Sequence, residues 1–326
     1  MTEVLEITDL TVSIPDIDQA PVDKVSLTVT KGQTLGIVGE SGCGKSLTMM
    51  AILGLAGRSM RVKGSVRLNG EELIGKSDYE MSRIRGRRIG MIFQNPLTCL
   101  NPVLTVGRHL AEALKLHQPE LSTKAITRRS LELLDLVAVP FPEKRLQQYP
   151  HELSGGMRQR IMIAIAMCND PELLIADEPT TALDVTIQAQ ILQILEDLQK
   201  TYGLAIVLIS HDLGVIAEAA NRMAVMYGGR ICEQGDVRHV LGAPKHPYTR
   251  ALLETIPRLT GPIGTLLSIP GSLPPIGLRP SGCCFHPRCS FALDDCKRQN
   301  PELRHVQTQL VACHNPMEVN FEGVGG

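Results

Sequence analysis

The residues that could do chemistry begin with a glycine-rich loop in the first part of the chain. The loop consists of Gly39, Glu40, Ser41, Gly42, Cys43, Gly44, Lys45 and Ser46. It follows the P-loop pattern of glycine, four residues, glycine, lysine and then serine or threonine. An apolar, strand-like run precedes the loop, and a proline-free stretch beginning at Leu47 suits a helix. In that setting the backbone N–H groups bind phosphate oxygens. We predict that Lys45 reaches the β- and γ-phosphates of a nucleotide and that Ser46 ligates Mg²⁺.

A second candidate site lies where a later apolar strand ends in two carboxylates. Residues 173–176 are followed directly by Asp177 and Glu178. This order is the Walker B arrangement, in which the aspartate holds Mg²⁺ and the glutamate is the general base for an attacking water. We predict these two roles for Asp177 and Glu178.

A serine and two glycines open a long apolar helix between these motifs. Ser154 can cap that helix, and the N–H groups of Gly155 and Gly156 are then available to an anion. Taken alone, the pattern is equally typical of an ordinary helix N-cap.

The elements that must position these residues alternate along the chain. Strands are predicted at residues 4–12, 25–30, 64–70, 89–94, 173–176 and 204–209, the third of them ending in an Asn-Gly turn. A helix is predicted from 185 to 200 with Asp184 as its N-cap. Strand, helix and strand at these lengths predict a parallel sheet. Residues 103–167 show helical spacing instead and predict a mostly helical insertion.

The end of the chain is rich in cysteine. It contains Cys283, Cys284, Cys289, Cys296 and Cys313, and it follows a proline- and glycine-rich stretch, 257–282, that predicts an extended linker. In a reducing cytosol such a cluster indicates a metal site before disulfides. The spacing matches neither a zinc ribbon nor a ferredoxin. Four of the thiolates could hold zinc or a four-iron cluster, or stay free; the secondary candidates are His286, His305 and His314.

Composition excludes several classes of protein. The 326 residues predict two domains, and 43% hydrophobic with 21% charged residues is ordinary for globular proteins. A net charge of −1 and 3% aromatic residues argue against a general nucleic-acid binder. The N-terminus does not resemble a signal peptide, and the apolar runs are too short to span a bilayer. We expect a soluble, cytoplasmic chain that reaches a membrane only through a partner.

In their order and spacing, these motifs resemble the ATP-binding subunits of ABC transporters. The shared motifs are GESGCGKS, Gln94, LSGGM, LLIADEP, Asp184 and His211. The resemblance implies an α/β P-loop NTPase fold with a RecA-like core, an antiparallel β subdomain and a helical subdomain at about 103–167. It also implies a head-to-tail dimer. Each ATP would lie between the P-loop of one subunit and the Ser154–Gly156 turn of the other.

The same resemblance implies roles for the remaining residues. Gln94 would contact Mg²⁺ or the lytic water, and Asp184 would cross the dimer interface. His211 would hydrogen-bond the γ-phosphate and Glu178, so that Lys45, Gln94, Glu178 and His211 form the catalytic set. Ile14 stands where the family often has an aromatic ring against adenine, which leaves base affinity and selectivity open.

A closer resemblance covers nearly the whole chain. Residues 93–102, 149–160 and 246–253, with the cysteine-rich tail, are similar to the ATP-binding subunits of dipeptide and oligopeptide importers. This implies an ATPase domain at 1–245 and an extension at 246–326. The implied partners are two permeases, an extracytoplasmic substrate-binding protein and usually a paralogous ATPase, at the cytoplasmic face of the bacterial inner membrane. A [4Fe–4S] cluster is implied at Cys283, Cys289, Cys296 and Cys313, with Cys284 spare and zinc as the alternative.

Three alternative functions remain compatible with parts of this pattern. Importers of nickel chelates are close relatives of the peptide importers. A non-transport ABC ATPase acting on DNA or ribosomes would share the motifs, although the chain has neither a long coiled coil nor a second cassette. A P-loop small-molecule kinase would leave LSGGM and His211 unexplained.

Overall fold

The chain divides into two compact units in the computed structural model, which describes residues 2–255 and 269–318. The first unit contains Gly75–Ile209, Val29–Gln33 and the first residues of the chain. The second contains Leu5–Thr28, Thr34–Ile74 and the described residues from Ser210 on. Residues 257–268, the first part of the predicted linker, lie outside the described residues.

A parallel sheet forms the centre of the first unit. Its strands are β6 (Ile89–Ile92), β7 (Leu173–Asp177) and β8 (Ala205–Ser210), and β7 pairs in parallel with both neighbours. Every residue of β7 and β8 is buried. Continuous apolar strands of this kind belong to the interior of a parallel sheet. The predicted parallel arrangement is confirmed for these three strands.

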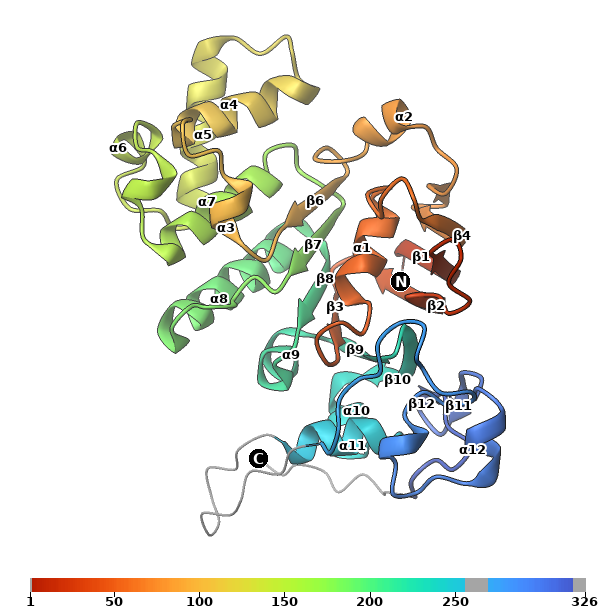
Figure 1. Ribbon diagram of the computed structural model, residues 1–326. Helices are drawn as coiled ribbons and strands as arrows, with labels where there is room; N and C mark the ends of the chain where they lie inside the picture. Colours follow the sequence, from red (N-terminus) through yellow and green to blue (C-terminus); the bar gives the residue numbers. More distant parts are fainter. Residues whose placement is uncertain (1, 256–268, 319–326) are drawn as a thin grey trace. The chain divides into compact units, whose positions relative to one another are not determined.

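Helices make up most of the rest of the first unit. They are α2 (Asp78–Ser82), α3 (Pro96–Cys99), α4 (Val106–His117), α5 (Thr123–Leu136), α6 (Pro142–Leu146), η1 (Pro150–Glu152), α7 (Gly155–Ala166) and α8 (Val185–Tyr202). Helix α5 packs against α4, α6 and α7 (Figure 1). Thr105, Ser122 and Ser154 cap α4, α5 and α7 with their side-chain oxygens. The stretch with helical spacing therefore folds as helices that start at local capping signals.

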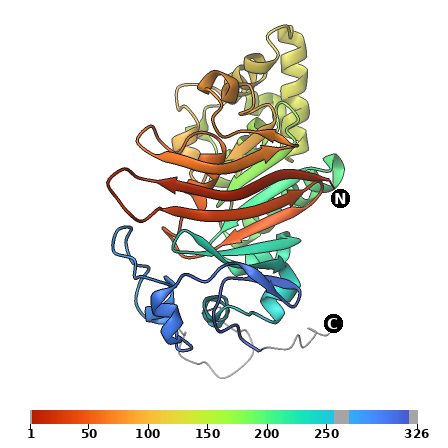
Figure 2. The ribbon, with the colours of Figure 1, turned by 90° about the vertical axis from the view of Figure 1, so that its right-hand side faces the viewer.

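An antiparallel group of strands opens the second unit. Its strands are β1 (Glu3–Ser13), β2 (Val22–Thr30), β4 (Arg61–Leu68) and β5 (Glu71–Glu72), in the order β2-β1-β4-β5 (Figure 2). Strand β4 pairs antiparallel with β1 and β5. Asn69 and Gly70 join β4 to β5 with positive φ angles of 48° and 80°. Two positive φ angles are what a tight hairpin turn requires, so the predicted Asn-Gly turn is confirmed.

The second unit also contains the strand that leads into the glycine-rich loop. This strand, β3 (Thr34–Val38), pairs in parallel with β9 (Arg222–Tyr227). Strand β10 (Arg230–Asp236) pairs antiparallel with β9 and also with β12 (Gln309–Val311). Strand β12 in turn pairs with β11 (Arg304–Val306). The cysteine-rich end of the chain thus adds a hairpin to β10 (Figure 1).

The helices of the second unit are short. They are α1 (Lys45–Ile52), α9 (Leu213–Ala219), α10 (Val237–Gly242), α11 (Pro247–Glu254), η2 (His286–Arg288) and α12 (Asp294–Arg298). Across residues 2–255 and 269–318, none of the helices is both long and apolar enough to span a bilayer.

A glycine in β6 allows the end of α7 to lie close to the sheet. An ideal Cβ on Gly90 would stand 2.5 Å from the carbonyl oxygen of Ala166 in α7. We predict that Gly90→Ala lowers the free energy of unfolding by about 1–3 kcal/mol because a backbone atom must move. In Gly235→Ala, the control in β10, the nearest atoms are side-chain atoms at 3.3 Å. Urea denaturation compares the two variants, and an equal or larger loss in Gly235→Ala would contradict this prediction.

Candidate functional site

The glycine-rich loop joins β3 to α1 in the second unit, and its backbone needs glycine at two points. Gly39 has φ 156°, and an ideal Cβ there would stand 2.1 Å from the carbonyl oxygen of Met226. Gly44, the residue before α1, has φ 109° and lies against the carbonyl oxygen of Pro21. Side chains at either position would clash, so the tight curl of the loop depends on these glycines.

The lysine of the loop is buried inside this curl. Lys45 is 6% exposed, and its Nζ donates hydrogen bonds to the carbonyl oxygens of Gly39 (2.7 Å) and Glu40 (3.1 Å). The Sγ of Cys43 lies 3.8 Å from the same nitrogen. Burial raises the pKa of the Cys43 thiol although Lys45 opposes the increase, so the thiol is neutral. The backbone of the glycine-rich loop therefore holds the ammonium of Lys45 in place.

The first turn of α1 carries the hydroxyl side chains next to this lysine. Ser46 is exposed and Thr48 is buried, with its Oγ1 donating to the carbonyl oxygen of Gly44 at 2.9 Å. Ser46 is therefore accessible to solvent at the start of α1. Leu47, between them, is half-buried.

In the first unit, the carboxylate that follows β7 is held by two side chains. Glu178 Oε2 accepts hydrogen bonds from Gln94 Nε2 and from Thr181 Oγ1, both at 2.8 Å. Gln94 follows β6, and Glu178 follows the neighbouring strand β7. The carboxyl ends of adjacent parallel strands lie at one edge of the sheet, so these predicted residues meet.

Glu178 also has an unusual backbone conformation. Its φ is 49°, in the left-handed region that a glutamate rarely adopts, and its N–H donates to the carbonyl oxygen of Ile209 at 3.0 Å. Strain of this kind is concentrated at functional sites. Asp177, one residue earlier, ends β7 and is 6% exposed. Thr181 was not predicted from the sequence, although a hydroxyl three residues after a carboxylate is a local signal that could have found it.

The Ser154 turn lies beside the start of α8. Ser154 Oγ accepts the N–H of Met157 at 3.3 Å and so caps α7, while Asp184 Oδ1 accepts the N–H of Ile187 at 2.9 Å and caps α8. Ideal Cβ atoms on Gly155 and Gly156 would stand 3.6 Å from Leu183 and 2.7 Å from Ile187. The two predicted turns are therefore neighbours, and Ser154 itself is exposed.

Two other predicted residues belong to the second unit. His211 directly follows β8 and is exposed. Ile14 is half-buried at the start of the loop between β1 and β2. Gln19 in the same loop accepts the N–H groups of Gly277 (3.0 Å) and Arg279 (2.9 Å), so the far end of the predicted linker is tied to this loop.

The cysteine-rich tail brings its thiols together. Cys283 N–H donates to the carbonyl oxygen of Cys296 at 2.8 Å. Burial raises the pKa of the Cys313 thiol to about 12, and nearby Cys283, Cys289 and Cys296 add to the increase. Cys284 also lies near Cys283, but nearby Arg279 and Arg230 oppose the effect of burial on its pKa. Within the described residues, no group of three or more His, Cys, Asp or Glu side chains has the arrangement that holds a metal ion.

Two of the three histidines predicted as secondary metal ligands lie within hydrogen-bond distance of backbone carbonyl oxygens. His286 Nδ1 lies 3.0 Å from the carbonyl oxygen of Cys283, and His314 Nε2 lies 2.9 Å from that of Gln299. His305 is exposed in β11.

Comparison with known families gives two matches. The model of the ABC transporter family matches residues 22–181, and the model of the oligopeptide/dipeptide transporter C-terminal region matches residues 232–296. The second match includes three of the four cysteines predicted as cluster ligands and ends before the fourth, Cys313.

Several curated proteins are similar along almost the whole chain. The oligopeptide transport ATP-binding protein of Mycobacterium tuberculosis is 50% identical over 94% of this chain and 51% of its own length. The dipeptide transport ATP-binding protein of Haemophilus influenzae is 47% identical over 91% of this chain and 90% of its own length. For the oligopeptide transport ATP-binding protein of Escherichia coli the values are 45%, 97% and 94%. The chain spans about half the length of the mycobacterial relatives it matches.

A solved structure shares the fold. The dimeric structure of a bacterial ABC transporter cassette has a TM-score of 0.63 and 28% identity, and covers 72% of this chain and 98% of its own. The same values hold for a post-hydrolysis state of that cassette bound to ADP and phosphate. The predicted α/β P-loop fold with its ABC-type organisation is confirmed.

Substituting two capping serines distinguishes the structural role of a helix cap from a role in catalysis. Ser122 caps α5 as Ser154 caps α7, with Oγ 3.2 Å from the N–H of Ala125. We predict that Ser122→Ala and Ser154→Ala each lower the free energy of unfolding by about 1 kcal/mol. Only Ser154→Ala should lower ATP turnover, on the order of a hundredfold, because only that turn is predicted to contact a γ-phosphate. Urea denaturation and phosphate release measure the two effects, and equal turnover by both variants would contradict the prediction.

Proposed function

This chain belongs to the ABC transporter family, and we propose on that premise that it is the ATP-hydrolysing subunit of a bacterial importer of small peptides. One observation carries the proposal: the similarity to peptide transport ATP-binding proteins extends beyond the cassette into the oligopeptide/dipeptide C-terminal region. An ABC cassette alone would support ATP hydrolysis without indicating what is transported.

The P-loop binds the triphosphate in this proposal. Lys45 exchanges the carbonyl oxygens of Gly39 and Glu40 for β- and γ-phosphate oxygens, and the N–H groups of the loop bind the same phosphates. Because these carbonyls hold the ammonium before nucleotide arrives, the lysine is already placed at the phosphate site.

Glu178 is the proposed general base. Gln94 and Thr181 both donate to Oε2, which orients the carboxylate for accepting a proton from water. Ser46, Asp177 and Gln94 are the proposed ligands of Mg²⁺. The ion supplies positive charge that stabilises the phosphoryl oxygens in the transition state.

A second ATPase subunit, a paralogue or another copy, completes each site in a head-to-tail dimer. The support within this chain is the exposed Ser154 turn, whose N–H groups form an anion-binding helix terminus at the surface. Asp184 lies beside this turn and would contact the partner, and His211 would sense the γ-phosphate. Binding of two nucleotides then favours the closed dimer, and hydrolysis favours opening.

We predict that Glu178→Gln traps this closed state. The amide is nearly isosteric with the carboxylate but cannot accept the proton of water, so turnover should fall on the order of a hundredfold or more while ATP still binds. Light scattering of the subunit with its partner ATPase in MgATP should show a persistent dimer. Glu143→Gln, on the exposed start of α6, is the control and should turn over normally. Undiminished hydrolysis at the site built on this chain's own P-loop would refute the role of Glu178.

The proposed transporter also contains two permeases and an extracytoplasmic substrate-binding protein. This chain would be peripheral, at the cytoplasmic face of the inner membrane. The test is reconstitution in vesicles with these partners: di- or oligopeptides together with the binding protein should stimulate ATP hydrolysis. Stimulation by nickel chelates alone would identify a different cargo. Recovery of nucleic acid without any permease would refute the transport function.

For the tail, we propose that Cys283, Cys289, Cys296 and Cys313 hold a [4Fe–4S] cluster, with zinc as the alternative. The support is that Cys283, Cys289 and Cys296 all lie close enough to Cys313 to affect its thiol electrostatically. Thiolates are the ligands of both iron–sulfur clusters and structural zinc. The bound group would cross-link segments that bury little apolar surface of their own.

Two adjacent cysteines provide the test. We predict that Cys283→Ser loses the bound iron and its visible absorption, whereas Cys284→Ser keeps both, because Cys284 lies among arginines. Anaerobic purification followed by iron, sulfide and zinc analysis measures the outcome. Metal-free wild-type protein, or equal iron loss in both variants, would refute the proposed ligands.

A further inference from the structure

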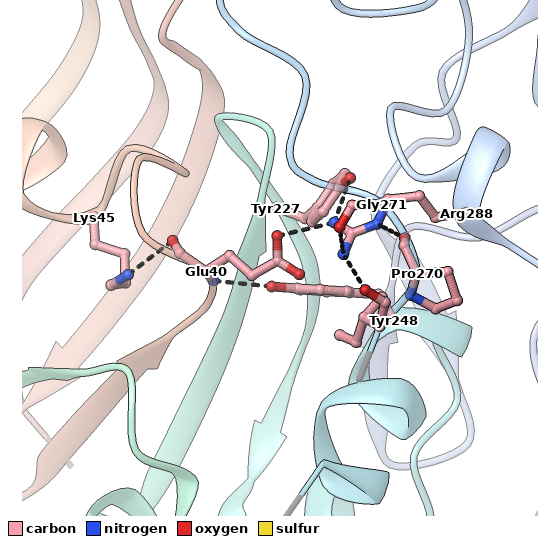
Figure 3. Close-up of polar contacts among 8 residues, drawn as sticks. Glu40, Lys45, Tyr227, Tyr248, Pro270, Gly271 and Arg288 are labelled. Carbon is pink, nitrogen blue, oxygen red and sulfur yellow. Dashed lines mark hydrogen bonds and ion pairs between the residues drawn. The ribbon is translucent and has the colours of Figure 1, made fainter. Parts of the chain in front are cut away.

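An arginine of the cysteine-rich tail binds the carboxylate of the P-loop. Arg288 Nη1 donates to Glu40 Oε2 at 2.9 Å, and the side chains of Arg288 and Glu40 are 8% and 25% exposed (Figure 3). The same guanidinium donates to the hydroxyl of Tyr227 at 3.2 Å. Its Nε donates to the carbonyl oxygen of Pro270 at 2.8 Å, and its Nη2 to those of Ile269 (3.3 Å) and Gly271 (3.4 Å). These contacts hold the guanidinium in one orientation, which makes it a fixed counter-charge.

The backbone of Glu40 is held from a second direction. Its N–H donates to the hydroxyl oxygen of Tyr248 at 2.9 Å, and Tyr248 is fully buried in α11. Phe285, three residues before Arg288, packs with ring centroids 5.2 Å from Tyr248 and 5.3 Å from Tyr227. The tail thus places one aromatic and one cationic side chain on the residues that hold Glu40.

Helix α11 is in turn fixed to the sheet. The buried carboxylate of Glu233 in β10 accepts the N–H groups of Lys245 (2.7 Å) and His246 (2.9 Å), which immediately precede the helix. Tyr248 is therefore anchored through α11 to β10, and Figure 3 shows Glu40 bonded to both this tyrosine and Arg288.

The position of Glu40 explains why its charge must be controlled. Its own carbonyl oxygen contacts Lys45 Nζ, the group that we propose binds the triphosphate. A carboxylate with no counter-charge so near would repel the phosphates and would compete with them for the ammonium. The contact with Arg288 removes both effects.

We propose that Arg288 is a positioning residue of the nucleotide site: it binds the Glu40 carboxylate and keeps it away from Lys45 and the triphosphate. The cysteine-rich tail is then part of the nucleotide site of its own chain, through one side chain that reaches the P-loop. This inference rests on the proposed binding of ATP by Lys45. It does not depend on what is transported or on which metal the tail holds.

The test is the affinity of the purified full-length chain for a fluorescent ATP analogue with Mg²⁺. We expect Arg288→Met to raise Kd about tenfold, because a partly buried carboxylate loses its partner. Turnover at saturating ATP, measured with the partner ATPase, should change by less than about threefold, because Arg288 has no proposed role in the chemical step. Arg288→Lys keeps the charge and should stay within about threefold of the wild-type Kd. Arg250→Met, which breaks the exposed Arg250–Glu254 pair of α11, is the matched control and should leave Kd unchanged.

A double variant separates the charge of Glu40 from a general loss of tail structure. Glu40→Gln combined with Arg288→Met should bind the analogue more tightly than Arg288→Met alone, because the carboxylate without a counter-charge is gone. If Arg288 only held the tail in place, the double variant would bind as weakly as the single variant or more weakly. That result, or an unchanged Kd in Arg288→Met, would overturn the inference. Failure of the wild-type chain to bind MgATP would instead overturn the proposed function.

Discussion

The second unit is built around a buried ammonium. Lys45 is almost inaccessible to solvent, and its charge is stabilised by the carbonyl oxygens of Gly39 and Glu40. A buried cation requires such partners because transfer out of water is costly. The backbone can supply them only by curling, which in turn requires glycine at Gly39 and Gly44, where side chains would meet other carbonyl oxygens. The P-loop sequence therefore follows from the need to hold this charge ready for phosphate.

The first unit meets a different requirement, which is to hold the carboxylate of Glu178, the proposed general base, in one orientation. Glu178 directly follows β7, and its backbone has a left-handed conformation that costs free energy. Hydrogen bonds from Gln94 and Thr181 to one carboxylate oxygen and the bond from its own N–H to Ile209 offset that cost. The parallel pairing of β6, β7 and β8 brings these groups together, so the sheet register sets the geometry of the proposed base.

What could be predicted from the sequence is the structure that local chemistry determines. Asp184 caps α8 through an N–H three residues away, and Asn69 forms its turn with the next residue, so short patterns contain the whole interaction. Thr181 was missed although its signal is equally local. The bond between Arg288 and Glu40 joins residues 248 positions apart, and no spacing rule relates them. The domain boundary near residue 245 remains a prediction. The catalytic roles also remain predictions, because they depend on nucleotide and on a partner subunit.

The tail illustrates how a short segment can be ordered without a core of its own. Among its buried side chains, Phe285 packs on Tyr227 of β9 and Tyr248 of α11, and Val311 lies in β12, which pairs with β10. Arg279 and Arg288 donate hydrogen bonds to backbone carbonyl oxygens, including those of Gly228 and Pro270. A segment whose buried side chains pack on other parts of the chain cannot fold independently of those parts. Because Cys289 directly follows Arg288 at the end of η2, a group bound to Cys289 would restrain the backbone from which Arg288 extends to Glu40.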